Sequence, residues 1–188
     1  METKALYELV EAQSRAFDRH ENVKSGQTWK YHIACVIENA VMLAEKLGGD
    51  KEVVEIAALF HDYANLVDFE KYSETHHIAS GELAEPILRE HGYKQDFIDK
   101  VKRCIFSHRG SVVKEKLTIE EVCLADGDGL THIENVVELI VWRGQKGDSV
   151  DEANAFVKRK IQRTYAKLSA GSKEYIKDRY EAALKIFY

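Results

Sequence analysis

Residues 52–66 read EVVEIAALFHDYANL and form the most informative stretch of the chain. Apolar side chains occupy nearly every position from Val53 to Phe60, so a helix formed here has no polar face. Such a helix is buried in the core. It leads into His61 and Asp62, two polar groups that are costly to bury unless they are paired or hold a metal ion. The pair is therefore either a satisfied core histidine with a capping aspartate, or a pair of metal ligands.

Length and charge limit the classes of protein that this chain can represent. The 188 residues predict one domain with a core large enough to need no disulfides. A formal net charge of -5 gives no electrostatic footprint for a nucleic-acid duplex. We find no apolar span or signal peptide, so we expect a cytoplasmic protein with no membrane partner. Its three cysteines are far apart and odd in number, which indicates reduced core residues.

The composition predicts an all-α fold. There is one proline, and no segment shows the alternation of a strand. Helices are expected over residues 3–20, 28–47, 73–90 and 95–108, with others opening near residues 118, 150 and 172. A core helix capped by Asp50 lies between the second and third of these. Pro86 is expected to kink or split the helix over 73–90, and the basic run KRKIQR at 158–163 is expected to be a solvated face.

Two further polar residues lie on predicted apolar stripes. His32 shares its stripe with Val36 and Leu43, a spacing that faces the core. Asp126 lies on a line with Leu130 and other apolar residues, and a carboxylate there needs a cation. Asp128 competes with Asp126, because its neighbours at helical spacing are less uniformly apolar. Imidazole and carboxylate ligands suit manganese, iron, nickel, cobalt or magnesium better than structural zinc.

The chain resembles the HD-domain metal-dependent phosphohydrolases over residues 28–133. The resemblance is carried by TWKYHIACVIENAVMLAEKLGGD, VVEIAALFHDYA, THHIASGELA, FSHR and VCLADGDGL. It implies that one divalent metal ion is bound by His32, His61, Asp62 and a late aspartate. The phrase LAD favours Asp126 as that aspartate, and the leucine two residues after Asp128 favours Asp128. Asp126 is the preferred assignment.

The resemblance also implies residues for a second metal ion and for the substrate. In two-metal relatives, extra histidines bind a second ion and the Asp of the His-Asp pair bridges both ions. His77 and His108 are the candidates here, and His76 is expected to be a solvated turn residue. Arg109 is expected to contact the substrate phosphate. Lys71 and Lys114 are weaker candidates in charged stretches. Asp62 is expected to orient the attacking water.

These observations predict a metal-dependent phosphohydrolase of a small phosphorylated molecule, with a nucleotide as the expected substrate. The alternatives are a non-catalytic sensor that uses the metal pocket for binding, and an HD-fold oxygenase with two irons. A cyclic-dinucleotide phosphodiesterase is disfavoured, because Ser107-His108 replaces the adjacent histidines of such enzymes and a Gly-Tyr-Pro signature is missing. Residues 1–20 and 148–188 are expected to wrap the core as extra helices. The last helix is expected to pack on this body or on a second copy, in a homodimer.

Overall fold

The structure is a computed structural model that describes residues 2–21, 26–112 and 115–187. It confirms the all-α class, because no strand occurs in these ranges. In chain order its elements are α1 (Glu2–His20), the short π-helix η1 (Trp29–Ile33), α2 (Ala34–Leu47), α3 (Lys51–Phe60), α4 (Tyr63–Val67), α5 (Phe69–Tyr72), α6 (His76–Glu90), α7 (Gln95–His108), α8 (Ile119–Glu134), α9 (Val136–Gln145), α10 (Val150–Lys167) and α11 (Ala170–Leu184).

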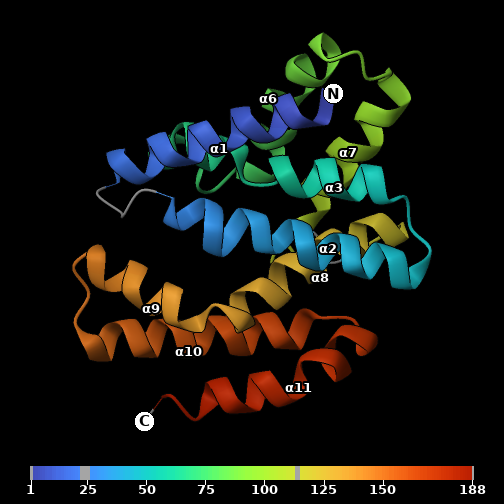
Figure 1. The fold of residues 1–188 in the computed structure, drawn as a ribbon. Helices are drawn as coiled ribbons and strands as arrows, with labels where there is room; N and C mark the ends of the chain where they lie inside the picture. Colours follow the sequence, from blue (N-terminus) through green and yellow to red (C-terminus); the bar gives the residue numbers. More distant parts are fainter. Residues whose placement is uncertain (1, 22–25, 113–114, 188) are drawn as a thin grey trace.

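The helices are stacked, but not in chain order (Figure 1). α1, α6 and α7 lie toward one end of the molecule, α3 lies between α1 and α2, and α10 and α11 form the opposite end. Between them, α8 contacts α2, α3 and α7 on one side, and α10 and α11 on the other. α10 and α11 therefore pack on the central helix α8, so the last helix lies on the body of the chain, one of the two places expected for it.

The core helix α3 is buried as its sequence predicts. Asp50 caps it by accepting a hydrogen bond from the Val53 backbone N–H at 3.3 Å. Every apolar side chain from Val53 to Phe60 is fully buried. The next two residues, His61 and Asp62, therefore leave the helix inside the protein, which fixes one wall of the site.

Two glycines allow α8 to lie unusually close to its neighbours. A Cβ on Gly127 would be 2.8 Å from the backbone nitrogen of Ala40 in α2. A Cβ on Gly129 would be 2.7 Å from Leu168 Cδ2 and 3.2 Å from Thr164 Cγ2 of α10. The stretch Asp126–Gly129 is thus held between α2 and α10.

Of the two outcomes expected for Pro86, a kink or a split, the split does not occur, because α6 runs continuously from His76 to Glu90. Cys35, Cys104 and Cys123 are free thiols, as expected, although Cys35 is only half-buried. Among the described residues, no helix has the length and apolar character needed to span a membrane.

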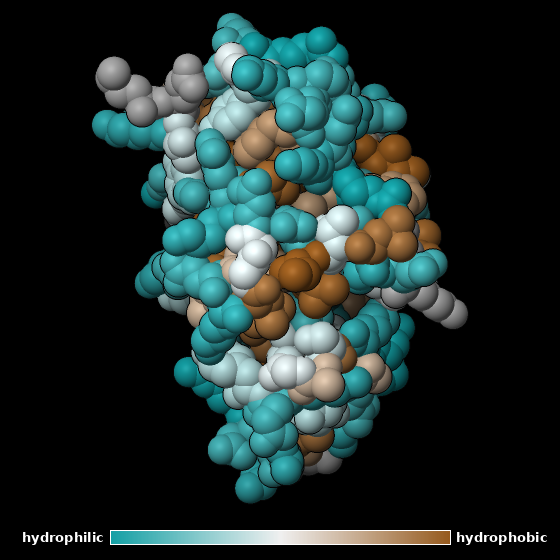
Figure 2. Space-filling view, turned by 90° about the vertical axis from the view of Figure 1, so that its right-hand side faces the viewer, coloured by the Kyte–Doolittle hydropathy of each residue, from teal (hydrophilic) through white to brown (hydrophobic). Residues whose placement is uncertain are grey.

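The surface is largely polar. Figure 2 shows one face on which hydrophilic residues predominate, with a small hydrophobic group near its centre. Leu117 and Ile119 are among the large apolar side chains that stay exposed. Scattered exposed apolar residues are normal on protein surfaces and indicate no partner by themselves.

Candidate metal centre

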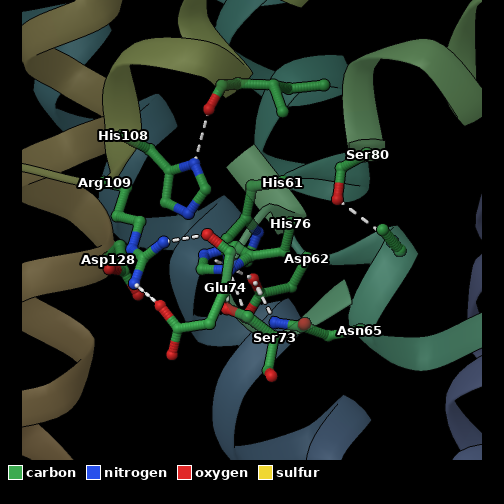
Figure 3. A network of polar contacts seen from close by, with 12 residues as sticks. His61, Asp62, Asn65, Ser73, Glu74, His76, Ser80, His108, Arg109 and Asp128 are labelled. Carbon is green, nitrogen blue, oxygen red and sulfur yellow. Dashed lines mark hydrogen bonds and ion pairs between the residues drawn. The ribbon is translucent and has the colours of Figure 1, made fainter. Parts of the chain in front are cut away.

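Five elements meet around a cluster of histidines and aspartates at the centre of the fold. His32 comes from η1, and His61 and Asp62 follow α3 directly. His76 is the first residue of α6, His108 is the last residue of α7, and Asp128 lies in α8. Figure 3 shows the side chains of His61, Asp62, His76, His108 and Asp128 gathered from these elements. Side chains from separate helices therefore converge on one point, and His32, His61, Asp62 and His108 are those among them that the sequence predicted to lie in the site.

The first group of side chains consists of His32, His61 and Asp128. Each offers one nitrogen or oxygen, and these three atoms all lie within 4.8 Å of one another. The two Nε2 atoms of the histidines are 3.2 Å apart, and His32 Nε2 is 3.8 Å from Asp128 Oδ1. This arrangement can hold one metal ion.

The second group consists of Asp62, His76 and His108, whose ligand atoms also lie within 4.8 Å of one another. Asp62 Oδ1 faces His76 Nε2 at 3.6 Å. The other oxygen, Oδ2, is 3.3 Å from His32 Nε2 and 3.5 Å from His61 Nε2. Asp62 therefore lies between the two groups, with one carboxylate oxygen turned to each.

Three of the histidines are oriented by backbone carbonyls. His61 Nδ1 is 2.7 Å from Ala58 O, and His108 Nδ1 is 2.6 Å from Ile105 O. His76 Nδ1 is 2.8 Å from Ser73 O. Because a carbonyl only accepts hydrogen bonds, Nδ1 carries the proton in each ring and Nε2 keeps its lone pair. Metal-binding histidines are fixed in this way in proteins.

The charges in the cluster favour ionised carboxylates and shift the imidazoles in both directions. Burial lowers the pKa of His61, whereas at His32 burial is outweighed by the hydrogen bond with Asp62 and the charge of Asp128, which raise the pKa. Burial raises the pKa of the Asp62 carboxyl, but the charges of His61, His76 and His32 hold this pKa well below its usual value. Burial lowers the pKa of His108 to about 4. Two anionic carboxylates and imidazole lone pairs that face the same small space fit a divalent cation.

The preferred assignment of Asp126 does not match this geometry. Its carboxylate accepts hydrogen bonds from the Ser169 backbone N–H, at 3.2 Å for Oδ2 and 3.3 Å for Oδ1. Asp126 therefore holds the start of α11, and it is Asp128 that lies with His32 and His61. The buried carboxylate of Asp126 is satisfied by a backbone donor, so it does not need the cation that the sequence suggested.

The choice between the two adjacent histidines is also reversed. His76 lies in the cluster, whereas His77 is not in either group of candidate ligands. The His77 ring packs beside Phe106 with 5.8 Å between ring centroids, and it lines a surface cleft with Gly81 and Lys102. His76 is thus a candidate ligand, and the catalytic role expected of His77 has no support from its position.

The candidate phosphate-binding residue Arg109 lies beside the cluster (Figure 3). It is paired with Glu74: its Nη1 donates to the backbone carbonyl and its Nη2 is 3.0 Å from the carboxylate. Lys71 lies with its ammonium over the ring of Tyr72 and has no contact with the cluster in the described residues. Lys114 falls outside the described residues.

Two residues near the cluster were not expected from the sequence. His132 Nδ1 is 3.4 Å from Asp128 Oδ1, and burial lowers the pKa of His132 to about 3. Its signal was its spacing, four residues after Asp128, which places both on one side of α8. Lys160 of α10 is the other, because the charges of Asp128 and Asp62 act on it. The sequence predicts a solvated face for the run KRKIQR, but its Lys160 is half-buried.

Comparison with known proteins gives the family. A family model described as HD domain matches residues 30–133, more than half of the chain. The chain belongs to the HD-domain family. At the level of the superfamily, membership of the HD-domain family supports a metal-dependent hydrolase. The side chains brought together here fit such a metal.

The relatives found include proteins whose roles are not described. YpgQ of Bacillus subtilis is 31% identical over 140 residues, which are 70% of this chain and 65% of YpgQ. A protein of Clostridium beijerinckii is 32% identical over 73 residues, which are 39% of this chain and 46% of that protein. The chain thus matches less than two thirds of the length of either relative.

Two solved structures share the fold. The crystal structure of YpgQ in complex with ADP has a TM-score of 0.70 and 22% identity, and covers 96% of this chain and 93% of that one. A predicted HD superfamily hydrolase from an uncultured Thermotogales bacterium has a TM-score of 0.66 and 20% identity, and covers 97% of this chain and 87% of that one. Both alignments extend well beyond residues 30–133, so the terminal helices belong to the shared fold.

Proposed function

We propose that this protein is a metal-dependent phosphohydrolase that cleaves a phosphate ester or anhydride of a nucleotide. The observation that carries the proposal is the position of Asp62 between two groups of candidate ligands, with one oxygen turned to each. Pairs of metal ions that share ligands are typical of enzymes that hydrolyse phosphate compounds. The family to which the chain belongs supports the same class of reaction.

The residues of the chain have separate roles in this proposal. A bound divalent ion would activate a water molecule and polarise a phosphoryl oxygen. His32, His61 and Asp128 would hold one ion, and His76 and His108 would hold a second, with Asp62 shared. The pairing of Asn65 Nδ2 with Asp62 Oδ1 at 3.1 Å keeps this carboxylate in place. Arg109 would bind a phosphate oxygen by exchanging its partner Glu74 for the substrate.

The more specific part of the proposal is that the substrate is a nucleotide. It is supported by the ADP in the crystal structure of YpgQ, a protein that shares the fold. The residues expected to bind substrate, which include Arg109, would contact its phosphates through their charge, and none of them is assigned to the nucleotide base. We therefore expect selectivity for the phosphate chain to exceed selectivity for the base.

The test is a panel of nucleotides and simple phosphate esters, assayed with manganese, cobalt, nickel, iron or magnesium. We expect hydrolysis that a chelator abolishes and that manganese or cobalt restores. His61→Ala should lose bound metal and activity together, because His61 faces both His32 and Asp62. Metal-dependent turnover that is unchanged in His61→Ala would contradict the assignment of the site.

A second candidate is an oxygenase with two irons, which needs a second set of histidines. His76 and His108 supply such a set. Iron-dependent consumption of oxygen, without hydrolysis of any phosphate compound in the panel, would choose this function. If the protein binds metal and nucleotide but catalyses neither reaction, the result would instead indicate a non-catalytic sensor.

A further inference from the structure

We propose that three cations of α10, Lys160, Arg163 and Lys167, bind the non-reacting phosphates of a polyphosphate chain whose reacting phosphate lies at the metal cluster. This deepens the proposed function and rests on it. The three residues lie outside the part of the chain that the HD-domain model matches, residues 30–133. We call them the basic stripe, and the ligand class that they select is a di- or triphosphate over a monophosphate.

The spacing of the basic stripe places its members on one side of α10. Positions 160, 163 and 167 follow the i, i+3, i+7 pattern of a helical face. This face borders the buried one, because Val157, Ile161 and Leu168 are buried. Lys160 is half-buried, and Arg163 and Lys167 are exposed. The stripe thus runs along the edge of the contact between α10 and the body of the protein.

Contacts at two points place this edge next to the metal cluster. Thr164, between Arg163 and Lys167, lies 3.2 Å from the position that a Cβ on Gly129 would take, one residue after Asp128. Further along, Lys167 Cδ lies 3.6 Å from the Cβ position of Gly110, two residues after His108. The stripe therefore passes from the Asp128 side of the cluster to the end of α7.

The electrostatic interactions agree with this course. The charges of Asp128 and Asp62 act on Lys160, and the charge of Lys160 acts on His132. Burial lowers the pKa of Lys167, and the charges of Arg163 and Lys160 lower it further. The cations thus repel one another beside the cluster, and a polyanion laid along them would relieve this repulsion.

In the described ranges, no member of the basic stripe makes a hydrogen bond or an ion pair within 4.0 Å. Other cations of the chain are paired, as Lys51 is with Glu45 and Lys102 is with Glu85. A half-buried ammonium group such as that of Lys160 is unfavourable unless it gains an anionic partner. A row of unpaired donors beside a phosphate-hydrolysing site suits the oxygens of further phosphates.

The test measures binding of inorganic tripolyphosphate and orthophosphate to the manganese-loaded protein by calorimetry. Free manganese is held constant, and bound metal is measured before and after. Lys160→Met and Lys167→Met remove the charge and keep most of the length of the side chain. Lys160→Arg keeps the charge. Lys158→Met is the control, because Lys158 lies on the same helix about 200° away from Lys160.

We expect the wild-type protein to bind tripolyphosphate more tightly than orthophosphate. Each Met variant should weaken tripolyphosphate binding roughly tenfold or more, the effect of losing a charged hydrogen bond. Orthophosphate affinity and bound metal should be nearly unchanged, Lys160→Arg should restore most of the preference, and Lys158→Met should behave as the wild type. No preference for tripolyphosphate in the wild type, or an equal loss for both anions in the variants, would overturn the proposal.

Hydrolysis separates this proposal from the proposed function. If tripolyphosphate binds through the stripe but no phosphate compound is turned over, the proposed function fails and the stripe stands as a binding site. If nucleoside triphosphates are hydrolysed equally well by the wild type and Lys160→Met, the stripe fails and the proposed function stands.

Discussion

Asp126 and Asp128 are two residues apart on α8, so their side chains leave the helix about 200° apart. One carboxylate meets the backbone of Ser169, and the other meets His32. The sequence could not choose between them because α8 is buried on most sides, so an apolar stripe can be drawn through either residue. Which side of α8 faces the cluster depends on the helices that surround it, and these come from distant parts of the sequence.

The two aspartates give the first prediction. Asp128→Asn should weaken metal binding by at least 10–100-fold, the range found when even a supporting residue of a metal site is lost. Asp126→Asn should keep the metal, because the Asp126 oxygens accept hydrogen bonds from the Ser169 backbone N–H and Asp126 is not in either group of candidate ligands. Calorimetric titration of manganese into the two metal-free variants checks this. Equal losses in both would show that Asp126 contributes to the metal site.

A second prediction concerns the adjacent histidines. His76→Ala should lower the number of metal ions bound per chain, because His76 Nε2 faces Asp62. His77→Ala should bind as much metal as the wild type, since His77 packs beside Phe106. Metal analysis after gel filtration provides the measurement. A loss of metal in His77→Ala and not in His76→Ala would restore the original preference.

At the scale of the helix, the glycines of α8 explain how the site is placed. The sequence ADGDG drew attention for its aspartates, but Gly127 and Gly129 determine how closely α2 and α10 approach. One sequence does not reveal such a close approach, because the residues that require the glycines, Ala40 and Thr164, belong to other helices. The basic run of α10 was interpreted as solvated for the same reason. The distance of this basic run from the cluster depends on where α10 packs against α8.

The third prediction tests this packing. Gly127→Ala should lower the free energy of unfolding by about 1–3 kcal/mol or more, as overpacking does. The new Cβ would meet the backbone of Ala40 at 2.8–2.9 Å, and backbone cannot move aside cheaply. Gly144→Ala in α9 is the control, because nothing lies within 4 Å of its Cβ position. That variant should gain about 0.5–1 kcal/mol, and denaturant unfolding compares the two.

If Gly127→Ala unfolds at the same denaturant concentration as the wild type, α2 and α8 are not held together as closely as described. If Gly144→Ala is strongly destabilised, the effect at position 127 cannot be assigned to packing.

For the whole molecule, the sequence predicted the class and the convergence of His32, His61 and Asp62. These came from local patterns, the buried helix α3 and the helical stripe of His32. Which of two neighbouring histidines or aspartates enters the cluster depends on contacts between distant segments. Those choices, at residues 76 and 77 and at residues 126 and 128, were therefore the ones that needed the structure.

The fourth prediction concerns stability without metal. The candidate ligands come from η1, the end of α3, α6, α7 and α8, so a bound ion would tie these elements together. Anything that binds only the folded state stabilises it, by about 2.7 kcal/mol at a free concentration 100 times Kd. Chelation should therefore lower the melting temperature, and manganese should restore it. His61→Ala should show no such dependence on metal, and an equal shift in this variant would place the stabilising ion elsewhere.

The most direct test of the metal site is anomalous diffraction from crystals grown with manganese. We expect one peak among His32, His61 and Asp128 and a second between His76 and His108, with Asp62 bound to both ions. A single peak, among His32, His61 and Asp128, would show that the proposed site holds one metal ion and not two. A peak at Asp126 or His77, or no peak at the cluster, would contradict the account.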